Sequence, residues 1–143
     1  MPKNILCAVD GSDIADRAAA CAAQLAKETG GKLTLVNVNT VPSERMAQTY
    51  FWDEKLVSAI DAQIHRQLAL ASKAAAKQGI AAADAVVITG SKVAAAIVAY
   101  ADAKQFDHIV IGTGVTTELE RLFLGSVATD VVARAHCPVT IVR

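Results

Sequence analysis

Two short polar segments are the places in this sequence where chemistry could occur. Asp10-Gly11-Ser12 follows the apolar run 4–9, and Gly125-Ser126 precedes a run with helical spacing. A carboxylate at the carboxyl end of a strand can hold ribose hydroxyls or a Mg²⁺ ion bound to phosphates. A serine that starts a helix adds a hydroxyl to free backbone N–H groups and a partial positive charge, which suits a phosphate. Together the two segments favour a nucleotide site.

Each segment also has a purely structural interpretation. Ser12 or Asp13 could cap the helix that follows, and Ser126 could be a capping serine behind a turn glycine. In the functional interpretation, Gly125 lets a ligand approach the backbone closely. Position in the sequence leaves both interpretations open.

Other reactive residue types give no comparable pattern. The segment Gly90-Ser91-Lys92 lacks the earlier glycine of a phosphate-binding P-loop and is predicted to be a capping turn. The aromatic triplet at 50–52 is expected to pack at the start of the next helix. The histidines lack metal-ligand spacing. The cysteines have no C-x-x-C spacing and do not indicate a disulfide framework or a zinc site; they are Cys7, Cys21 and Cys137.

Composition and charge limit the class of protein. The 143 residues are 53% hydrophobic and 20% charged, which predicts one globular domain spanning 1–143. Lys plus Arg equals Asp plus Glu at 14 each, so charge gives no reason to expect nucleic acid or an anionic membrane as a partner. No apolar run has the length of a signal peptide core or a membrane span. We therefore expect a soluble cytoplasmic protein.

Strand-like and helix-like segments alternate along the whole chain, and they must position the polar segments. Apolar runs predict strands at 4–9, 32–38, 84–89, 108–111 and 138–142. Helical spacing predicts helices that begin near residues 13, 53, 90 and 126. This alternation is typical of right-handed βαβ units that form a parallel sheet with helices on both faces. In such sheets ligands bind at the carboxyl ends of strands, where the strand order reverses.

The same segments resemble a known family. Ile-Leu-Cys-Ala-Val-Asp-Gly-Ser at 5–12, Leu-Gly-Ser-Val at 124–127 and Cys-Pro-Val-Thr-Ile-Val at 137–142 are similar to universal stress proteins, and the resemblance covers the whole chain. It implies an α/β fold: an open, five-stranded, parallel, doubly wound sheet. This sheet is Rossmann-like, of the adenine nucleotide alpha hydrolase-like type, with strand order 3-2-1-4-5 and helices on both faces.

Members of this family that bind ATP carry an Asp at the end of the first strand. They also carry a Gly, two residues, a second Gly, nine residues and then Gly-Ser or Gly-Thr. The resemblance implies that ATP, with Mg²⁺, binds here, that Asp10 meets the Mg²⁺ through phosphates and that Val38 offers its backbone to adenine. The residues that it implies on the nucleoside side are Ala8, Val9, Asp10, Val38, Ile111 and Gly112. Those that it implies for the phosphates are Gly125, Ser126 and Val127.

One position departs from the family pattern. The second glycine of the motif falls at position 115, where this chain has Val115. A β-branched side chain is a poor substitute where φ is positive or where a phosphate approaches the backbone. Gly114 could serve in a shifted loop, and nearby hydroxyls could contribute, those of Thr113, Thr116 and Thr117.

Three functions follow from these observations. The first is a regulatory stress-response protein that binds ATP and changes its protein partners with its nucleotide state. The second is an interaction module of the same fold that binds no nucleotide, which Val115 favours. The third is an enzyme, but the chain shows no positioned general base and no lysine in the phosphate loop, so we expect no enzyme and at most slow hydrolysis or autophosphorylation.

The resemblance also implies a homodimer that forms through the last strand, 138–142. The physical argument agrees, because an apolar edge strand promotes aggregation unless another strand covers it. The sequence does not identify the regulatory protein partner.

Overall fold

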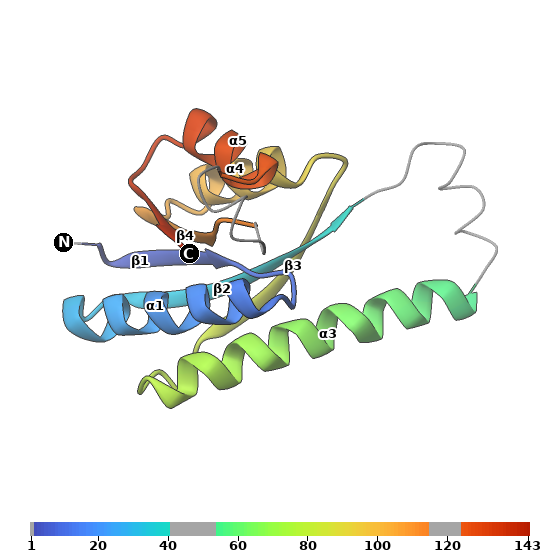
Figure 1. Ribbon diagram of the computed structural model, residues 1–143, viewed down its shortest axis with the longest axis horizontal. Coiled ribbons are helices and arrows are strands. Elements are labelled where there is room, and N and C mark those ends of the chain that lie inside the picture. The colour runs from blue at the N-terminus through green and yellow to red at the C-terminus, as the bar shows by residue number, and fades with distance from the viewer. Residues whose placement is uncertain (1, 41–53, 115–123) are drawn as a thin grey trace.

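Strands and helices alternate along the chain in the computed structural model, which describes residues 2–40, 54–114 and 124–143 (Figure 1). The strands are β1 (Asn4–Ala8), β2 (Lys32–Thr40), β3 (Asp84–Gly90), β4 (His108–Gly112) and β5 (Val139–Val142). The helices are α1 (Asp13–Thr29), α3 (Glu54–Lys77), α4 (Val93–Ala103) and α5 (Ser126–Arg134). All neighbouring strands pair in parallel, in the order β3-β2-β1-β4-β5. The predicted Rossmann-like sheet and its strand order are confirmed.

Helices cover both faces of the sheet, and this explains why the strands are continuously apolar. Helices α1 and α3 lie on one face, and α4 and α5 lie on the other (Figure 1). Ile5 and Cys7 of β1 point into the core under α1 and α3, whereas Leu6 and Ala8 point into the core under α4 and α5. Since successive side chains of a strand point to opposite faces, both sets must be apolar when both faces are buried.

The ends of the first helix are fixed by local chemistry. Ser12 caps α1, with its side chain accepting a hydrogen bond from the N–H of Ala15. Gly30 ends α1 in the left-handed conformation with φ of 70° and donates its N–H to the carbonyl of Ala26. Local chemistry thus determines both ends of this helix.

The strand order creates a crevice at the carboxyl ends of β1 and β4. The chain leaves β1 toward β2 on one side and later returns to β4 on the other side of β1. The connections that follow β1 and β4 therefore diverge to opposite faces of the sheet, and a space opens between them. Among the described helices, none combines the length and the apolar character that a membrane-spanning segment needs.

Candidate functional site

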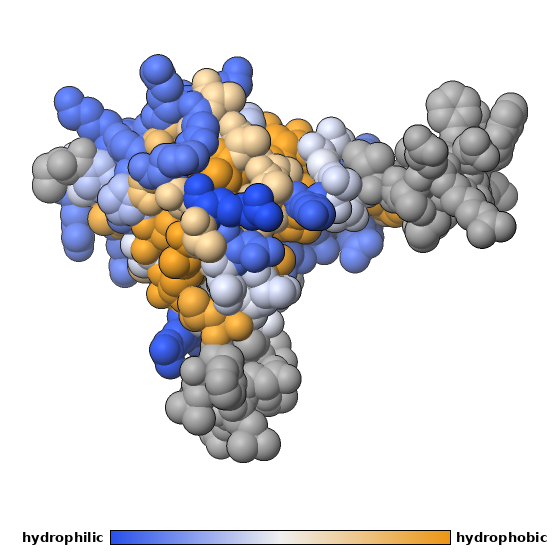
Figure 2. Space-filling model, turned by 90° about the horizontal axis from the view of Figure 1, so that it is seen from above, coloured by the Kyte–Doolittle hydropathy of each residue, from blue (hydrophilic) through white to orange (hydrophobic). Residues whose placement is uncertain are grey.

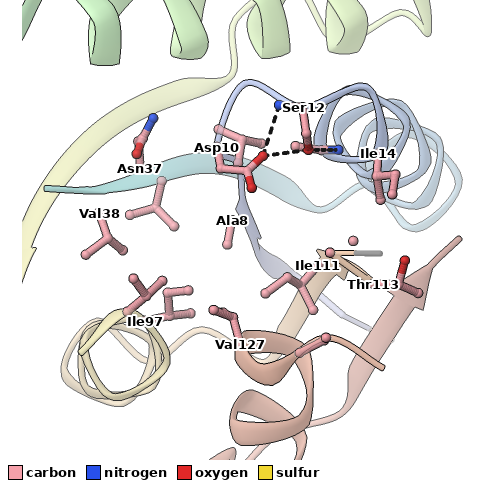
Figure 3. Close-up of a pocket in the computed structure, with 18 of the residues that line it drawn as sticks. Ala8, Asp10, Ser12, Ile14, Asn37, Val38, Ile97, Ile111, Thr113 and Val127 are labelled. Carbon is pink, nitrogen blue, oxygen red and sulfur yellow. Dashed lines mark hydrogen bonds between the residues drawn. The ribbon is translucent and has the colours of Figure 1, made fainter. Parts of the chain in front are cut away.

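A pocket of about 290 Å³ occupies this crevice (Figure 3). It brings together every predicted site residue that the structure describes, although these residues are far apart in the sequence. They are Ala8, Val9, Asp10, Val38, Ile111, Gly112, Gly125, Ser126 and Val127. Val115, the remaining predicted position, lies outside the described residues. The volume is close to the lower end of the range for small-molecule sites, about 300–1,000 Å³.

One half of the pocket is apolar. Figure 3 shows Val38, Ile97 and Val127 directed into it from β2, α4 and α5, with Ile111 and Ala8 at the ends of β4 and β1. An apolar slot between aliphatic side chains is suited to a flat ring system. Ile97 was not predicted as a site residue, because its contribution to the site depends on how α4 packs on the sheet.

In the first polar segment, the structure confirms the capping role of Ser12 and shows that Ser12 also orients Asp10. Ser12 caps α1, and it also donates its hydroxyl to Asp10 Oδ1 at 2.6 Å. The backbone N–H of Ser12 donates to the same oxygen at 3.0 Å. These two bonds fix one carboxylate oxygen, and within the described part of the chain Oδ2 accepts no hydrogen bond from protein. Asp10 is therefore oriented at the rim of the pocket with one oxygen available.

The second polar segment differs from the structural interpretation of Ser126. Gly125, and not Ser126, is the N-cap of α5, and no side chain caps this helix. The first hydrogen bond of α5 runs from the N–H of Thr129 to the carbonyl of Gly125 at 3.0 Å. The N–H groups of the first turn have no acceptor within the helix, as at every helix start. The structural interpretation of Ser126 as a capping serine is therefore wrong, and Ser126 lines the pocket without a capping role.

Gly125 brings α5 against the end of β4. Its N–H donates to the carbonyl of Thr113 at 2.8 Å, and a Cβ atom at Gly125 would lie 2.5 Å from that same oxygen. We predicted that this glycine admits a ligand. The structure shows that the absence of a side chain lets the carbonyl of Thr113 approach Gly125 closely. This contact places the start of α5 in the pocket wall. Gly114, between these segments in space, has φ of 74°.

Two further acidic residues, Asp13 and Asp16, lie in the first turn of α1 next to Asp10. Burial raises the pKa of Asp16 above its ordinary value, and the carboxylates of Asp13 and Asp10 raise it further. One oxygen of Asp16, Oδ1, is buried without a hydrogen-bond partner among the described groups. Asp10 is the one charged side chain among the described residues that line the pocket. An anionic ligand would therefore depend on backbone N–H groups, hydroxyls or an accompanying cation.

Metal-binding side chains do not gather elsewhere in the part of the chain that the structure describes. Within 2–40, 54–114 and 124–143, no group of three or more His, Cys, Asp or Glu side chains could hold a metal ion. Cys7 is fully buried, and burial raises the pKa of its thiol well above the ordinary value. This thiol is a core residue. All three cysteines are free, but Cys21 and Cys137 are only partly buried.

Comparison with known sequences gives full-length similarities. The model of the universal stress protein family matches residues 1–143. A universal stress protein from Thermus aquaticus is 36% identical over 143 residues, covering 100% of both chains. A universal stress protein from Methanocaldococcus jannaschii is 33% identical over 142 residues, covering 99% of this chain and 82% of the relative.

Comparison with solved structures gives the same result for the fold. A universal stress protein in complex with cAMP superposes with a TM-score of 0.75 at 26% identity, covering 99% of this chain and 97% of that chain. The universal stress protein from Archaeoglobus fulgidus in complex with dAMP superposes with a TM-score of 0.70 at 26% identity, covering 99% and 98%. Both of these similar structures carry an adenine nucleotide.

Proposed function

Because this chain belongs to the universal stress protein family, we propose that it binds an adenine nucleotide in the pocket between β1 and β4 and acts as a regulatory protein of the stress response. One observation carries the proposal: the pocket joins an apolar slot, an oriented carboxylate and an uncapped helix start. These three parts suit the base, the ribose and the phosphates of a nucleotide in their chemistry.

The proposed roles follow from what each group offers. The adenine ring lies in the apolar slot beside Val38 and meets the backbone of that residue. Asp10 accepts hydrogen bonds from ribose hydroxyls through its free oxygen. The phosphates lie at the start of α5, where the backbone N–H of Val127 and the hydroxyl of Ser126 donate to them.

The nucleotide complexes of similar proteins support this ligand class. One contains cAMP and another contains dAMP, and both share the adenine base while their sugar and phosphate parts differ. We extend the proposal to ATP on the strength of the Gly-Ser pair at 125–126. The adenine slot is common to all three ligands, so they are expected to compete for one site.

A Mg²⁺ ion fits this site only as a companion of the phosphates. Mg²⁺ usually keeps several waters and uses one or two carboxylates together with substrate phosphates. Asp10 supplies one such carboxylate at the rim, whereas the described residues hold no cluster that could bind a metal alone. The described residues that line the pocket include no basic side chain. A bound Mg²⁺ ion would therefore neutralise part of the negative charge of the phosphates.

The test is calorimetric titration of the protein with ATP and Mg²⁺, beside titrations with AMP and cAMP. Asp10→Ala and Ser126→Ala are each expected to weaken ATP binding by about 5- to 30-fold, since each removes hydrogen bonds to a charged or strongly polar ligand. Asp13→Ala and Ser91→Ala are the matched controls, because both side chains are exposed and neither lines the pocket.

A second candidate function is a dimeric interaction module of the same fold that binds no nucleotide. Val115, in place of the motif glycine, favours it. This candidate gains support if millimolar ATP produces neither heat nor thermal stabilisation of the wild-type protein. A Val115→Gly variant that then binds ATP would assign the loss to this one position.

We also propose a homodimer that forms through β5. This strand is one edge of the sheet, and all four of its residues are only half-buried. Figure 2 shows apolar surface on the side that carries α4 and α5, where Val132 is 49% exposed. Pairing of β5 with a second copy would cover both features. Sedimentation at micromolar concentration should give a dimer, and a monomer there would overturn this proposal.

A further inference from the structure

Gln67 of α3 lies behind the pocket and contacts two segments that line it. Asn37 Nδ2 donates a hydrogen bond to Gln67 Oε1 at 2.7 Å. A Cβ atom at Gly11 would lie 2.5 Å from Gln67 Cγ and 3.0 Å from Nε2, so this side chain fills the space directly against Gly11. Gln67 itself does not line the pocket.

The two residues that Gln67 contacts are the direct neighbours of two proposed ligand contacts. Asn37 precedes Val38, which lies on the base side of the pocket. Gly11 follows Asp10, the carboxylate at the rim. Figure 3 shows the amide of Asn37 directed away from the centre of the pocket and toward α3, where Gln67 accepts it.

The hydrogen bond between these two amides is partly buried, and Gln67 itself is half-buried. Asn37 is 4% exposed, and a buried amide that loses its partner costs far more than an exposed one. Gly11, with φ of 86°, is held between this pair and the hydrogen bonds of its own loop. On that other side Asp10 Oδ1 binds Ser12. The position of the loop thus depends on contacts from α3 as well as on its own turn.

We propose that Gln67 is a positioning residue for the nucleotide site, which ties the Asp10 loop to β2 and so fixes the separation between the ribose and base contacts. The role of Gln67 in nucleotide binding rests on the proposed function. The physical basis is that one amide spans the two segments: its Oε1 accepts from β2, and its stem and Nε2 face the loop. Gln67 acts through Asp10 and does not touch the ligand.

The first experiment needs no ligand. Gln67→Met keeps an unbranched stem of similar length against Gly11 but removes the amide. Amide hydrogen exchange of Ser12 and Ala15, whose N–H groups donate to Asp10 and Ser12, is expected to become about tenfold faster. Gln63→Met, an exposed position one turn earlier on α3, is the control and should leave this exchange unchanged.

A second variant keeps the test valid if Gln67→Met folds poorly. Asn37→Val removes the same hydrogen bond from the other side and places a strand-favouring residue in β2. It is expected to accelerate the exchange of the same two amides. Wild-type exchange at both amides in either folded variant would overturn the positioning role.

The second experiment measures the affinity for ATP with Mg²⁺ in a double-mutant cycle. Gln67→Met is expected to weaken binding about fivefold in the wild-type background and not at all in an Asp10→Ala background, because it acts through Asp10. Equal losses of ATP affinity in both backgrounds would show that Gln67 does not act through Asp10. If the wild-type protein binds no ATP but exchange still accelerates in Gln67→Met, the proposed function fails and the positioning of the loop stands.

Discussion

Gly125→Ala is expected to destabilise the protein by about 2 kcal/mol and to lower its affinity for ATP by more than about tenfold. The new Cβ atom would lie 2.5 Å from the carbonyl oxygen of Thr113. That oxygen belongs to the backbone and accepts the N–H of Gly125, so it cannot move aside without breaking a 2.8 Å hydrogen bond. The start of α5 must shift instead, and the proposed phosphate site shifts with it. Urea unfolding and calorimetric titration measure the two effects.

Gly114→Ala is the matched control for this prediction. Gly114 has φ of 74°, but the nearest atom that a Cβ would meet is Gly125 Cα at 4.0 Å. This substitution adds backbone strain of about 1 kcal/mol without a collision. It should therefore cost less stability than Gly125→Ala and leave α5 in place. If the two variants lose equal stability and equal affinity, close contact with Thr113 is not what Gly125 provides.

Gly112→Ala is expected to cost about 2–3 kcal/mol of unfolding free energy. Gly112 ends β4 directly under α1, and a Cβ atom there would lie 2.4 Å from Ile14 Cγ2 and 3.4 Å from the backbone of Ile14. Ile14 is buried in the first turn of α1, and its β-branched side chain is stiff about χ1, so relief of the contact strains this turn. The collision pushes α1 away from the sheet and with it the loop that carries Asp10. Denaturant unfolding monitored by circular dichroism measures the loss.

A double-mutant cycle separates this collision from other causes. Ile14→Ala alone removes buried methyl groups and is expected to destabilise by about 2–5 kcal/mol. In the double variant the alanine at 112 enters the space that Ile14 leaves, so the combined loss should fall below the sum by about 1–2 kcal/mol. Strictly additive losses would contradict the contact as the cause.

The origin of the site residues shows where sequence reasoning succeeds. Asp10 was found because it follows a strand-like run, and Ser126 was found because it begins a helix-like run. Both patterns are local in the sequence. The rule that ligands bind at the carboxyl ends of parallel strands then places both at one edge of the sheet. The reasons for individual residues were harder to predict. Gly125 leaves room for the carbonyl of Thr113, which lies earlier in the chain, and Gly112 leaves room for Ile14 of the first helix.

The sequence by itself determined the order and type of the elements, the parallel sheet and the residues at its carboxyl ends. It did so because apolar periodicity, turn-forming residues and the handedness of βαβ units act locally or apply to every such fold. Only the tertiary structure decided that α4 supplies Ile97 to the pocket, that Gly125 caps α5 and that Gln67 supports the Asp10 loop. These relations depend on how helices pack against the sheet. Such packing joins residues distant in the chain, and contacts of this kind leave no periodic or local pattern in the sequence.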